Sequence, residues 1–119
     1  MGEPLYAGHC YCEDCRKASG SGFIPFLGVR AGAVTFSGPS QSFDSPVANG
    51  GTATRNFCPR CGGLVFGGQR DVSDSFTLYV GSLDDPSLFH PTIAIFTQGR
   101  PDWAVIPPAL KVFARSPRE

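Results

Sequence analysis

Hydrophobic residues occur along this chain in short runs, each bounded by glycine, proline or polar residues. Residues 76–80 (Phe-Thr-Leu-Tyr-Val) alternate polar and apolar at their start, which is typical of a strand with one buried face. Runs of this length predict short strands and tight turns, with little helix. We expect strands at residues 23–29, 33–36, 41–44, 52–57, 64–66, 76–80 and 92–96.

Turn residues support the same interpretation, because the chain holds 15 glycines and 11 prolines. Gly38-Pro39 separates two of the expected strands, and Asn49-Gly50-Gly51 is a hairpin-type turn signal before the strand at 52–57. Pro25 predicts that the strand at 23–29 lies at a sheet edge or carries a bulge. Asp84-Asp85-Pro86-Ser87 predicts one short turn of helix. We therefore expect a mainly β, antiparallel domain, with an extended segment from Gly99 onward lying over the core.

Length and charge limit the classes of function. The 119 residues form one domain, residues 1–119, and ten basic against ten acidic side chains give a formal charge of zero. A neutral chain lacks the electrostatic footprint of a nucleic-acid or anionic-membrane binder. No apolar run approaches the ~20 residues of a membrane helix, and residues 1–10 lack a basic start followed by an apolar stretch. We expect a cytoplasmic protein with neither nucleic acid nor membrane as partner.

The five cysteines are the most informative residues. An odd number excludes a fully disulfide-bonded monomer, and closely spaced thiols in a reducing compartment more often bind metal. Cys10, Cys12 and Cys15 lie too close together for one regular element to point all three the same way, so we expect a tight turn. Three thiolates with one open position would make a catalytic zinc site. Three unrelated buried thiols, or a closed tetrathiolate that draws on both cysteine clusters, are the alternatives.

Cys58-Pro59-Arg60-Cys61-Gly62 forms the second cluster and predicts a knuckle, in which a turn brings two sulfurs together. Such a pair can bind zinc or act as a redox dithiol. The redox alternative would give a reversible disulfide between Cys58 and Cys61, but no thioredoxin-like strand and helix surround the pair.

Three segments in this order resemble the glutathione-dependent formaldehyde-activating enzyme (GFA) family, which includes centromere protein V. They are residues 9–20 (HCYCEDCRKASG), 54–62 (TRNFCPRCG) and 81–86 (GSLDDP), and the similarity continues through Ile95-Phe96 and residues 100–103. The resemblance implies a β-tent fold of packed antiparallel sheets with zinc sites at the edges. It also implies a catalytic zinc at the CxCxxC triad and half of a structural zinc site at Cys58 and Cys61.

The chain departs from the family pattern in two places. The other half of the family's structural site is a CxC pair in a preceding strand, whereas none of the nine residues before Cys10 is a cysteine. We therefore expect a β-tent without the usual N-terminal strand, about one zinc per chain, and an exposed sheet edge that a homodimer would cover. Tyr11 stands where relatives usually carry histidine.

The family activity implies a zinc-dependent carbon–sulfur lyase that acts on a thiol or thiol–aldehyde adduct similar to S-hydroxymethyl-glutathione. Cys10, Cys12 and Cys15 would be its catalytic residues, and a non-catalytic, zinc-stabilised binding module is the alternative. Three cations are candidates for substrate contact: Arg16, Lys17 and Arg55. The alternative is that they are solvated surface charges or, for Arg55, a buried structural charge.

Other polar side chains near the triad are weaker candidates for a functional role. His9 is a candidate hydrogen-bond donor to a metal-bound sulfur, although a lone histidine beside a turn is more often simply exposed to solvent. Ser19 and Ser21 could supply hydroxyls, and we expect His90 to be structural and Trp103 to pack.

Overall fold

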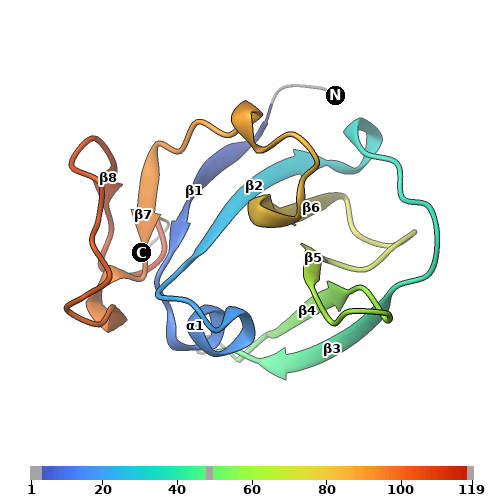
Figure 1. Cartoon of the computed structure of the whole chain (residues 1–119), viewed down its shortest axis with the longest axis horizontal. Helices are drawn as coiled ribbons and strands as arrows, with labels where there is room; N and C mark the ends of the chain where they lie inside the picture. The colour runs from blue at the N-terminus through green and yellow to red at the C-terminus, as the bar shows by residue number, and fades with distance from the viewer. Residues whose placement is uncertain (1–3, 48–49, 118–119) are drawn as a thin grey trace.

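The computed structural model describes residues 4–47 and 50–117, which form one curled sheet with a single α-helix at its end (Figure 1). The eight strands of this described part are β1 (Tyr6–Cys10), β2 (Ile24–Arg30), β3 (Gln41–Pro46), β4 (Thr52–Phe57), β5 (Leu64–Gly67), β6 (Ser75–Tyr79), β7 (Ile93–Ile95) and β8 (Lys111–Val112). The helices are α1 (Glu13–Ser19) and four 3-10 turns, η1 (Ala31–Ala33), η2 (Val80–Ser82), η3 (Pro86–Leu88) and η4 (Thr97–Gly99). None of these helices is long and apolar enough to cross a bilayer.

The strand order is β3-β4-β5-β6-β2-β1-β7-β8, so β3 and β8 form the edges and the first described strand, β1, lies inside the sheet. Strands β1 to β6 pair antiparallel, as expected, but β7 pairs parallel to β1 and to β8. The expectation of a wholly antiparallel arrangement is wrong at this end. The long connection after β6 allows the chain to enter β7 in the direction of β1, which a short hairpin could not do.

One face of the sheet carries the main core. Alternate residues of β1, β2, β5 and β6 point to it, which confirms the period of two seen in the sequence. The buried members of this cluster are Ala7, Leu27, Val29, Phe66, Phe76, Leu78 and Val80. Phe36, from the segment after η1, covers the cluster by stacking on Phe66 with ring centroids 4.1 Å apart. Burial of each such aromatic side chain contributes about 1.5–3 kcal/mol.

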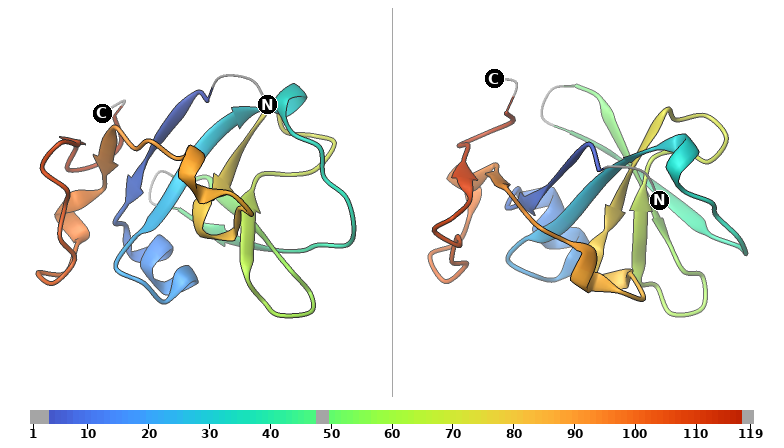
Figure 2. Two further views of the ribbon diagram at one scale, coloured as in Figure 1. Left: turned by 45° about the horizontal axis from the view of Figure 1, so that its top comes forward. Right: turned by 90° about the horizontal axis from the view of Figure 1, so that it is seen from above.

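A second, smaller core lies on the side of β1 where the C-terminal segment runs (Figure 2). Tyr11, Ala94, Ala104 and Leu110 are buried there, with Tyr11 and Ala94 fully inaccessible. The expected extended segment over the core is therefore confirmed. Trp103 does not pack as expected, because 71% of its surface is exposed.

Two other local expectations fail for identifiable reasons. Residues 33–36 form no strand, since η1 occupies Ala31–Ala33 and the following residues cross the core face instead of joining the sheet. Pro25 lies in the interior strand β2, opposite His9 of β1. Strand β6 ends at Tyr79, opposite Phe26, so Pro25 has no ladder partner on that side and its missing N–H costs nothing there.

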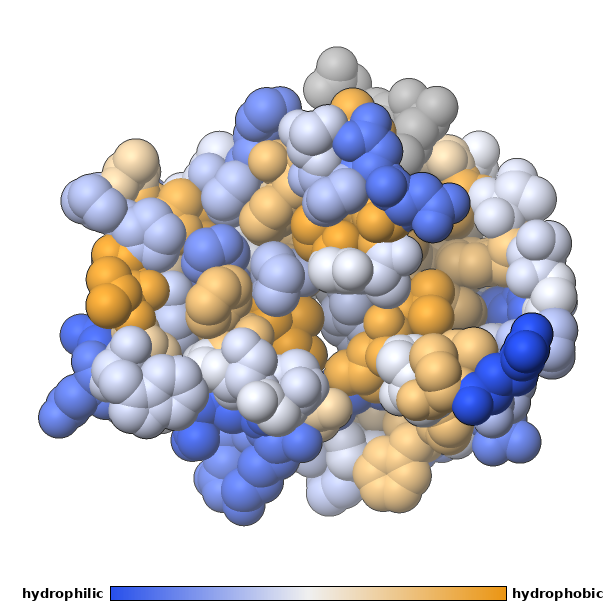
Figure 3. Space-filling view, in the orientation of Figure 1, coloured by the Kyte–Doolittle hydropathy of each residue, from blue (hydrophilic) through white to orange (hydrophobic). Residues whose placement is uncertain are grey.

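The remaining expected elements are present. Strand β4 spans the predicted residues, and η3 begins after Asp85, whose carboxylate accepts from the Ser87 backbone N–H at 3.2 Å. Asn49 of the predicted hairpin turn falls outside the described residues, but Gly50 beside it has a left-handed φ of 89°. Figure 3 shows hydrophobic side chains around a hollow near the middle of one face of the molecule.

Candidate metal centre

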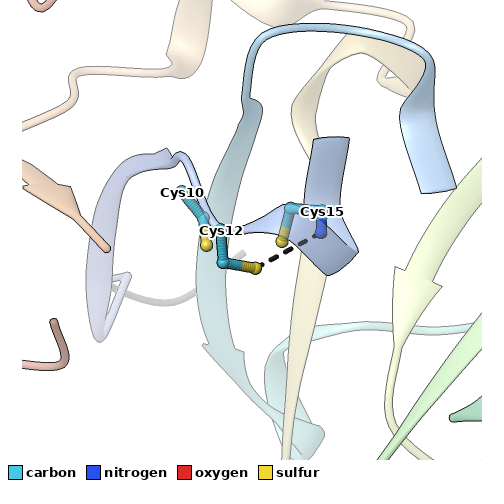
Figure 4. Close-up of side chains that lie close together, drawn as sticks. All are labelled: Cys10, Cys12 and Cys15. Carbon is cyan, nitrogen blue, oxygen red and sulfur yellow. Dashed lines mark hydrogen bonds between the residues drawn. The ribbon is translucent and has the colours of Figure 1, made fainter. Parts of the chain in front are cut away.

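The three N-terminal cysteines converge where β1 passes into α1 (Figure 4). Cys10 ends β1, Cys12 caps α1 and Cys15 lies in its first turn, and their sulfur atoms all lie within 4.8 Å of one another. The expectation of a tight turn is wrong, because the end of a strand and the start of a helix position the three cysteines instead. Neither element alone points three sulfurs one way, but their junction does.

Local sequence explains why the helix begins at this point. The Cys12 sulfur accepts a hydrogen bond from the Cys15 backbone N–H at 3.3 Å and so acts as the N-cap. Glu13 and Asp14 occupy the first turn, where carboxylates favour the positive end of the helix dipole. Gly20 ends the helix with a left-handed φ of 70°. The helix is thus built to hold Cys12 and Cys15 side by side.

The sheet fixes the third sulfur. Cys10 lies between Ile24 of β2 and Ile95 of β7, and the next residue, Tyr11, donates its backbone N–H to the Ile95 carbonyl at 3.0 Å. The Tyr11 hydroxyl donates to the Val105 carbonyl at 3.1 Å. Residues on both sides of the chain therefore hold the end of β1 in place.

His9 is buried rather than exposed, because its ring stacks on Phe23 with centroids 4.3 Å apart. Its Nδ1 lies 3.4 Å from the Tyr11 hydroxyl, and burial lowers the pKa of the ring. These contacts place His9 in the packing behind β1.

The sulfur arrangement fits a tetrahedral zinc ion. Zn–S bonds of about 2.3 Å place two thiolates of one tetrahedron about 3.8 Å apart, and the three sulfurs already lie within 4.8 Å of one another. No further cysteine, histidine or carboxylate joins this group within residues 4–47 and 50–117. An ion held here by protein ligands alone would keep one of four positions open.

Electrostatics of the triad favour a cation. Hydrogen bonds from Cys10 and Cys15 lower the pKa of Cys12 to about 2, whereas hydrogen bonding to Cys12 raises the pKa of Cys10 above its usual range. Without metal these hydrogen bonds favour negative charge on Cys12 and disfavour it on Cys10. Full ionisation of all three needs a positive ion among them.

Arg55, from β4, is the charged side chain that reaches the triad. Its Nη2 donates to the Cys15 sulfur at 3.8 Å, and its Nη1 donates to the Ser45 hydroxyl at 3.2 Å. Only 8% of Arg55 is exposed, and its Nε is buried with no hydrogen-bond partner within the described part of the chain. The sequence singled out Arg55 but gave no sign that it meets Cys15, which is 40 residues away.

The other two candidate cations lie on α1. Lys17 forms an exposed ion pair with Glu13 at 2.6 Å, and Arg16 is half-buried with an unpartnered Nε. Neither is among the described residues that line the cavity below. The hydroxyl of Ser19 caps the helix end by donating to the Cys15 carbonyl at 2.8 Å, and it accepts the Ser21 backbone N–H, whereas His90 is exposed.

A cavity of about 720 Å³ opens beside the triad on the face of the sheet opposite the main core. Cys10 and Cys15 contribute to its wall together with residues of β2, β4, β5, β6 and β7. The polar residues of the wall are Tyr6, Thr52, Thr54, Arg55, Gln69, Ser73, Ser75, Thr77 and Tyr79, and the larger apolar ones are Ile24, Phe26, Ile93 and Ile95. A small molecule in this cavity would contact the sulfurs directly.

Tyr79 is a residue of this wall that the sequence did not single out. Burial raises its pKa to about 12, so the phenol stays protonated at neutral pH, while the neighbouring Arg55 opposes that rise. A Cβ added at Gly67 would lie only 2.9 Å from the Tyr79 hydroxyl oxygen, so this glycine leaves the space that the hydroxyl occupies. The sequence signal for this role is the alternation of side chains in β6, which turns Tyr79 away from the face of the main core.

Cys58 and Cys61 lie apart from the triad, in the turn between β4 and β5. The Gly62 N–H donates to the Cys58 carbonyl at 2.7 Å, and Gly62 has a φ of 77° that favours glycine. The Gly63 N–H donates to the Cys61 sulfur at 3.4 Å, and Cys61 is exposed. The predicted knuckle is therefore present, with Cys61 exposed and Cys58 half-buried.

Comparison with known proteins agrees with this geometry. The family model for the glutathione-dependent formaldehyde-activating enzyme, GFA, matches residues 1–99 of the 119-residue chain. A search of curated proteins gave no match. The match spans the triad, Arg55, the knuckle and Tyr79, and the chain belongs to the GFA family.

Proposed function

We propose that this protein is a zinc-dependent carbon–sulfur lyase acting on thiol–aldehyde adducts of the S-hydroxymethyl-glutathione type. One observation carries the proposal: three sulfurs converge on one point, and two of them form part of the wall of a cavity large enough for such an adduct. A purely structural thiolate site does not need a cavity beside it.

Cys10, Cys12 and Cys15 would hold the zinc ion. When bound there, zinc would supply a position at which a substrate sulfur is stable as a thiolate at neutral pH. Three anionic ligands weaken the Lewis acidity of the ion relative to histidine ligands, so stabilisation of a sulfur is favoured over activation of water.

In the reaction R–S–CH₂–OH ⇌ R–SH + H₂C=O, the C–S bond breaks with its electron pair moving to sulfur, and the hydroxyl proton passes from the oxygen to that sulfur. In the reverse direction the oxygen must gain a proton. Tyr79 lines the cavity with a protonated hydroxyl, and we assign it the hydrogen bond to this oxygen. Arg55 offsets the negative charge of Cys15 from the side.

Metal analysis and turnover together test the proposal. We expect about one zinc per chain, and formaldehyde release from at least one thiol adduct with a rate above that of the metal-free protein. Stoichiometric zinc with no acceleration for any of a panel of thiol–aldehyde adducts would leave the alternative, a zinc-stabilised binding module.

Compartment and assembly are part of the same proposal. All five cysteines are free thiols, which suits a reducing cytoplasm. Strand β3 is an unpaired sheet edge in which Phe43 is 66% exposed, so we propose that two copies pair along it as a homodimer. Sedimentation at micromolar concentration tests this, and a monomeric profile contradicts it.

A further inference from the structure

The described side chains that line the cavity beside the triad include one cation and no carboxylate. Among its described lining residues, Arg55 is the side chain with a formal charge, apart from the cysteines, and none is Asp or Glu. The remaining wall is built from hydroxyls, one amide and apolar side chains. Among the described side chains of the wall, Arg55 is therefore the cation that a charged ligand would meet.

Arg55 has donors to spare for such a ligand. A guanidinium carries five N–H donors, whereas the hydrogen bonds to Ser45 and Cys15 use two of them. The Nε lacks a partner although the residue is more than nine-tenths buried. A buried donor without an acceptor is unfavourable, and the donors of Arg55 that a ligand would meet are those of the residue's cavity-lining surface.

The position of this cation determines which part of a ligand it meets. Its Nη2 contacts the Cys15 sulfur at 3.8 Å, so the charge stands at the triad and not at a distant end of the cavity. A ligand whose sulfur lies at the triad can reach Arg55 only with a group a few bonds from that sulfur. A carboxylate matches the planar fork of the guanidinium best.

We propose that the cavity selects adducts that carry a carboxylate within a few bonds of the C–S bond, and that Arg55 binds this carboxylate. This inference rests on the lyase function for the reaction, but the charge selection is a property of binding. Either partner of the adduct can bring the carboxylate, since a mercaptocarboxylic acid and an oxo-acid aldehyde both place it close to the new bond.

Binding to the cobalt-loaded protein tests the thiol as the source. The probes are 3-mercaptopropionate and its neutral isostere 3-mercaptopropionamide, followed by the sulfur-to-cobalt charge-transfer absorption. We expect the acid to bind about tenfold more tightly or better, and Arg55→Gln to bring this ratio close to one. Arg30→Gln, which removes an exposed cation outside the cavity wall, should leave the ratio unchanged.

A second arm tests the aldehyde as the source. Here 2-mercaptoethanol is titrated with glyoxylate or with its neutral amide, and tighter binding with glyoxylate alone assigns the carboxylate to the aldehyde. Equal affinities of acid and amide in both arms would overturn the proposal.

A metal-free readout covers the case in which Arg55→Gln does not fold. The Nε–H resonance of Arg55 in the nitrogen-15 spectrum should shift with 3-mercaptopropionate and stay in place with the amide. A shift that is the same with both compounds would contradict a carboxylate contact. Loss of lyase turnover for every adduct, with the acid-to-amide ratio intact, would refute the lyase function and leave the charge selection standing.

Discussion

The two cysteine-bearing regions of this protein, the triad and the knuckle, differ in local structure and in surroundings. In the triad, a strand end and a helix cap bring three sulfurs together beside a buried guanidinium and a cavity. In the knuckle, two thiols stand on a turn, of which Cys61 is exposed. The cysteine spacing in the sequence suggests metal binding in both regions, but their surroundings in the structure differ. Only the triad combines three ligands with a wall against which a small molecule can lie.

The largest contrast is expected in metal content. Cys12→Ser should lower bound zinc from about one ion per chain to nearly none, because two thiolates hold the ion far less well than three. Cys61→Ser should leave the zinc content unchanged. Elemental analysis of both purified variants checks this, and retention of zinc by Cys12→Ser would contradict the triad as the metal site.

Removal of one hydroxyl from the cavity should separate chemistry from metal binding. Tyr79→Phe should lower turnover by about a hundredfold, the size typical of a lost proton donor, with the zinc content intact. Tyr6→Phe is the matched control, because Tyr6 lies four residues before Cys10 on β1, about 13 Å away along the strand. Steady-state rates that fall equally in the two variants would contradict a special role for Tyr79.

The bulge between the two regions should have a measurable effect on stability. The register of β4 against β5 shifts at Asn56, whose Nδ2 donates to the Phe66 carbonyl at 3.1 Å and to the Gly68 carbonyl at 2.7 Å. Asn56→Ala removes both hydrogen bonds, one buried and one part-buried, and should cost about 1–3 kcal/mol of unfolding free energy. Thr54→Ala, which loses an exposed hydrogen bond to Asp44, should cost less in the same denaturant titration.

Thiol reactivity should rank Cys58 of the knuckle above Cys10 of the triad in the metal-free protein. Hydrogen bonds from the Arg60 and Cys61 backbone N–H groups lower the pKa of Cys58, so more of it is thiolate at neutral pH. Hydrogen bonding within the triad and burial raise the pKa of Cys10. Iodoacetamide should therefore alkylate Cys58 about tenfold faster than Cys10, or more. Peptide mass spectrometry over time gives both rates, and faster labelling of Cys10 would reverse the ranking.

The smallest effect is expected at the surface of α1. Lys17→Ala removes an exposed ion pair with Glu13 and should change stability by about 0.5 kcal/mol or less. Thermal unfolding of the zinc-loaded protein measures this change. A loss of several kcal/mol would mean that the pair supports the triad as Arg55 does.

The periodic parts of the fold could be predicted from sequence, and the non-local contacts could not. Strand β6 follows from alternating side chains, β4 from β-branched and aromatic residues after a turn signal, and the knuckle from its proline and glycine. Residues 33–36 have the composition of a strand, but Phe36 gains more by covering Phe66 than by joining the sheet. The parallel entry of β7 depends on the route of the connection before it, for which no local pattern exists.

The candidate site divides in the same way. The three cysteines could be predicted because they are neighbours in sequence. The contact of Arg55 with Cys15 joins strand β4 to helix α1, and it arises only when the sheet curls. Tyr79 reads as an ordinary strand residue until the cavity wall is known.

The family match ends at residue 99, but the folded unit does not. Ala104 and Leu110 pack around Tyr11, and the Val105 carbonyl accepts a hydrogen bond from the Tyr11 hydroxyl. A domain boundary drawn at residue 99 would therefore cut through this small core and expose Tyr11, the neighbour of Cys10, to solvent. Expression of a shortened chain would test a damaged protein, so the natural limit for engineering lies beyond Leu110.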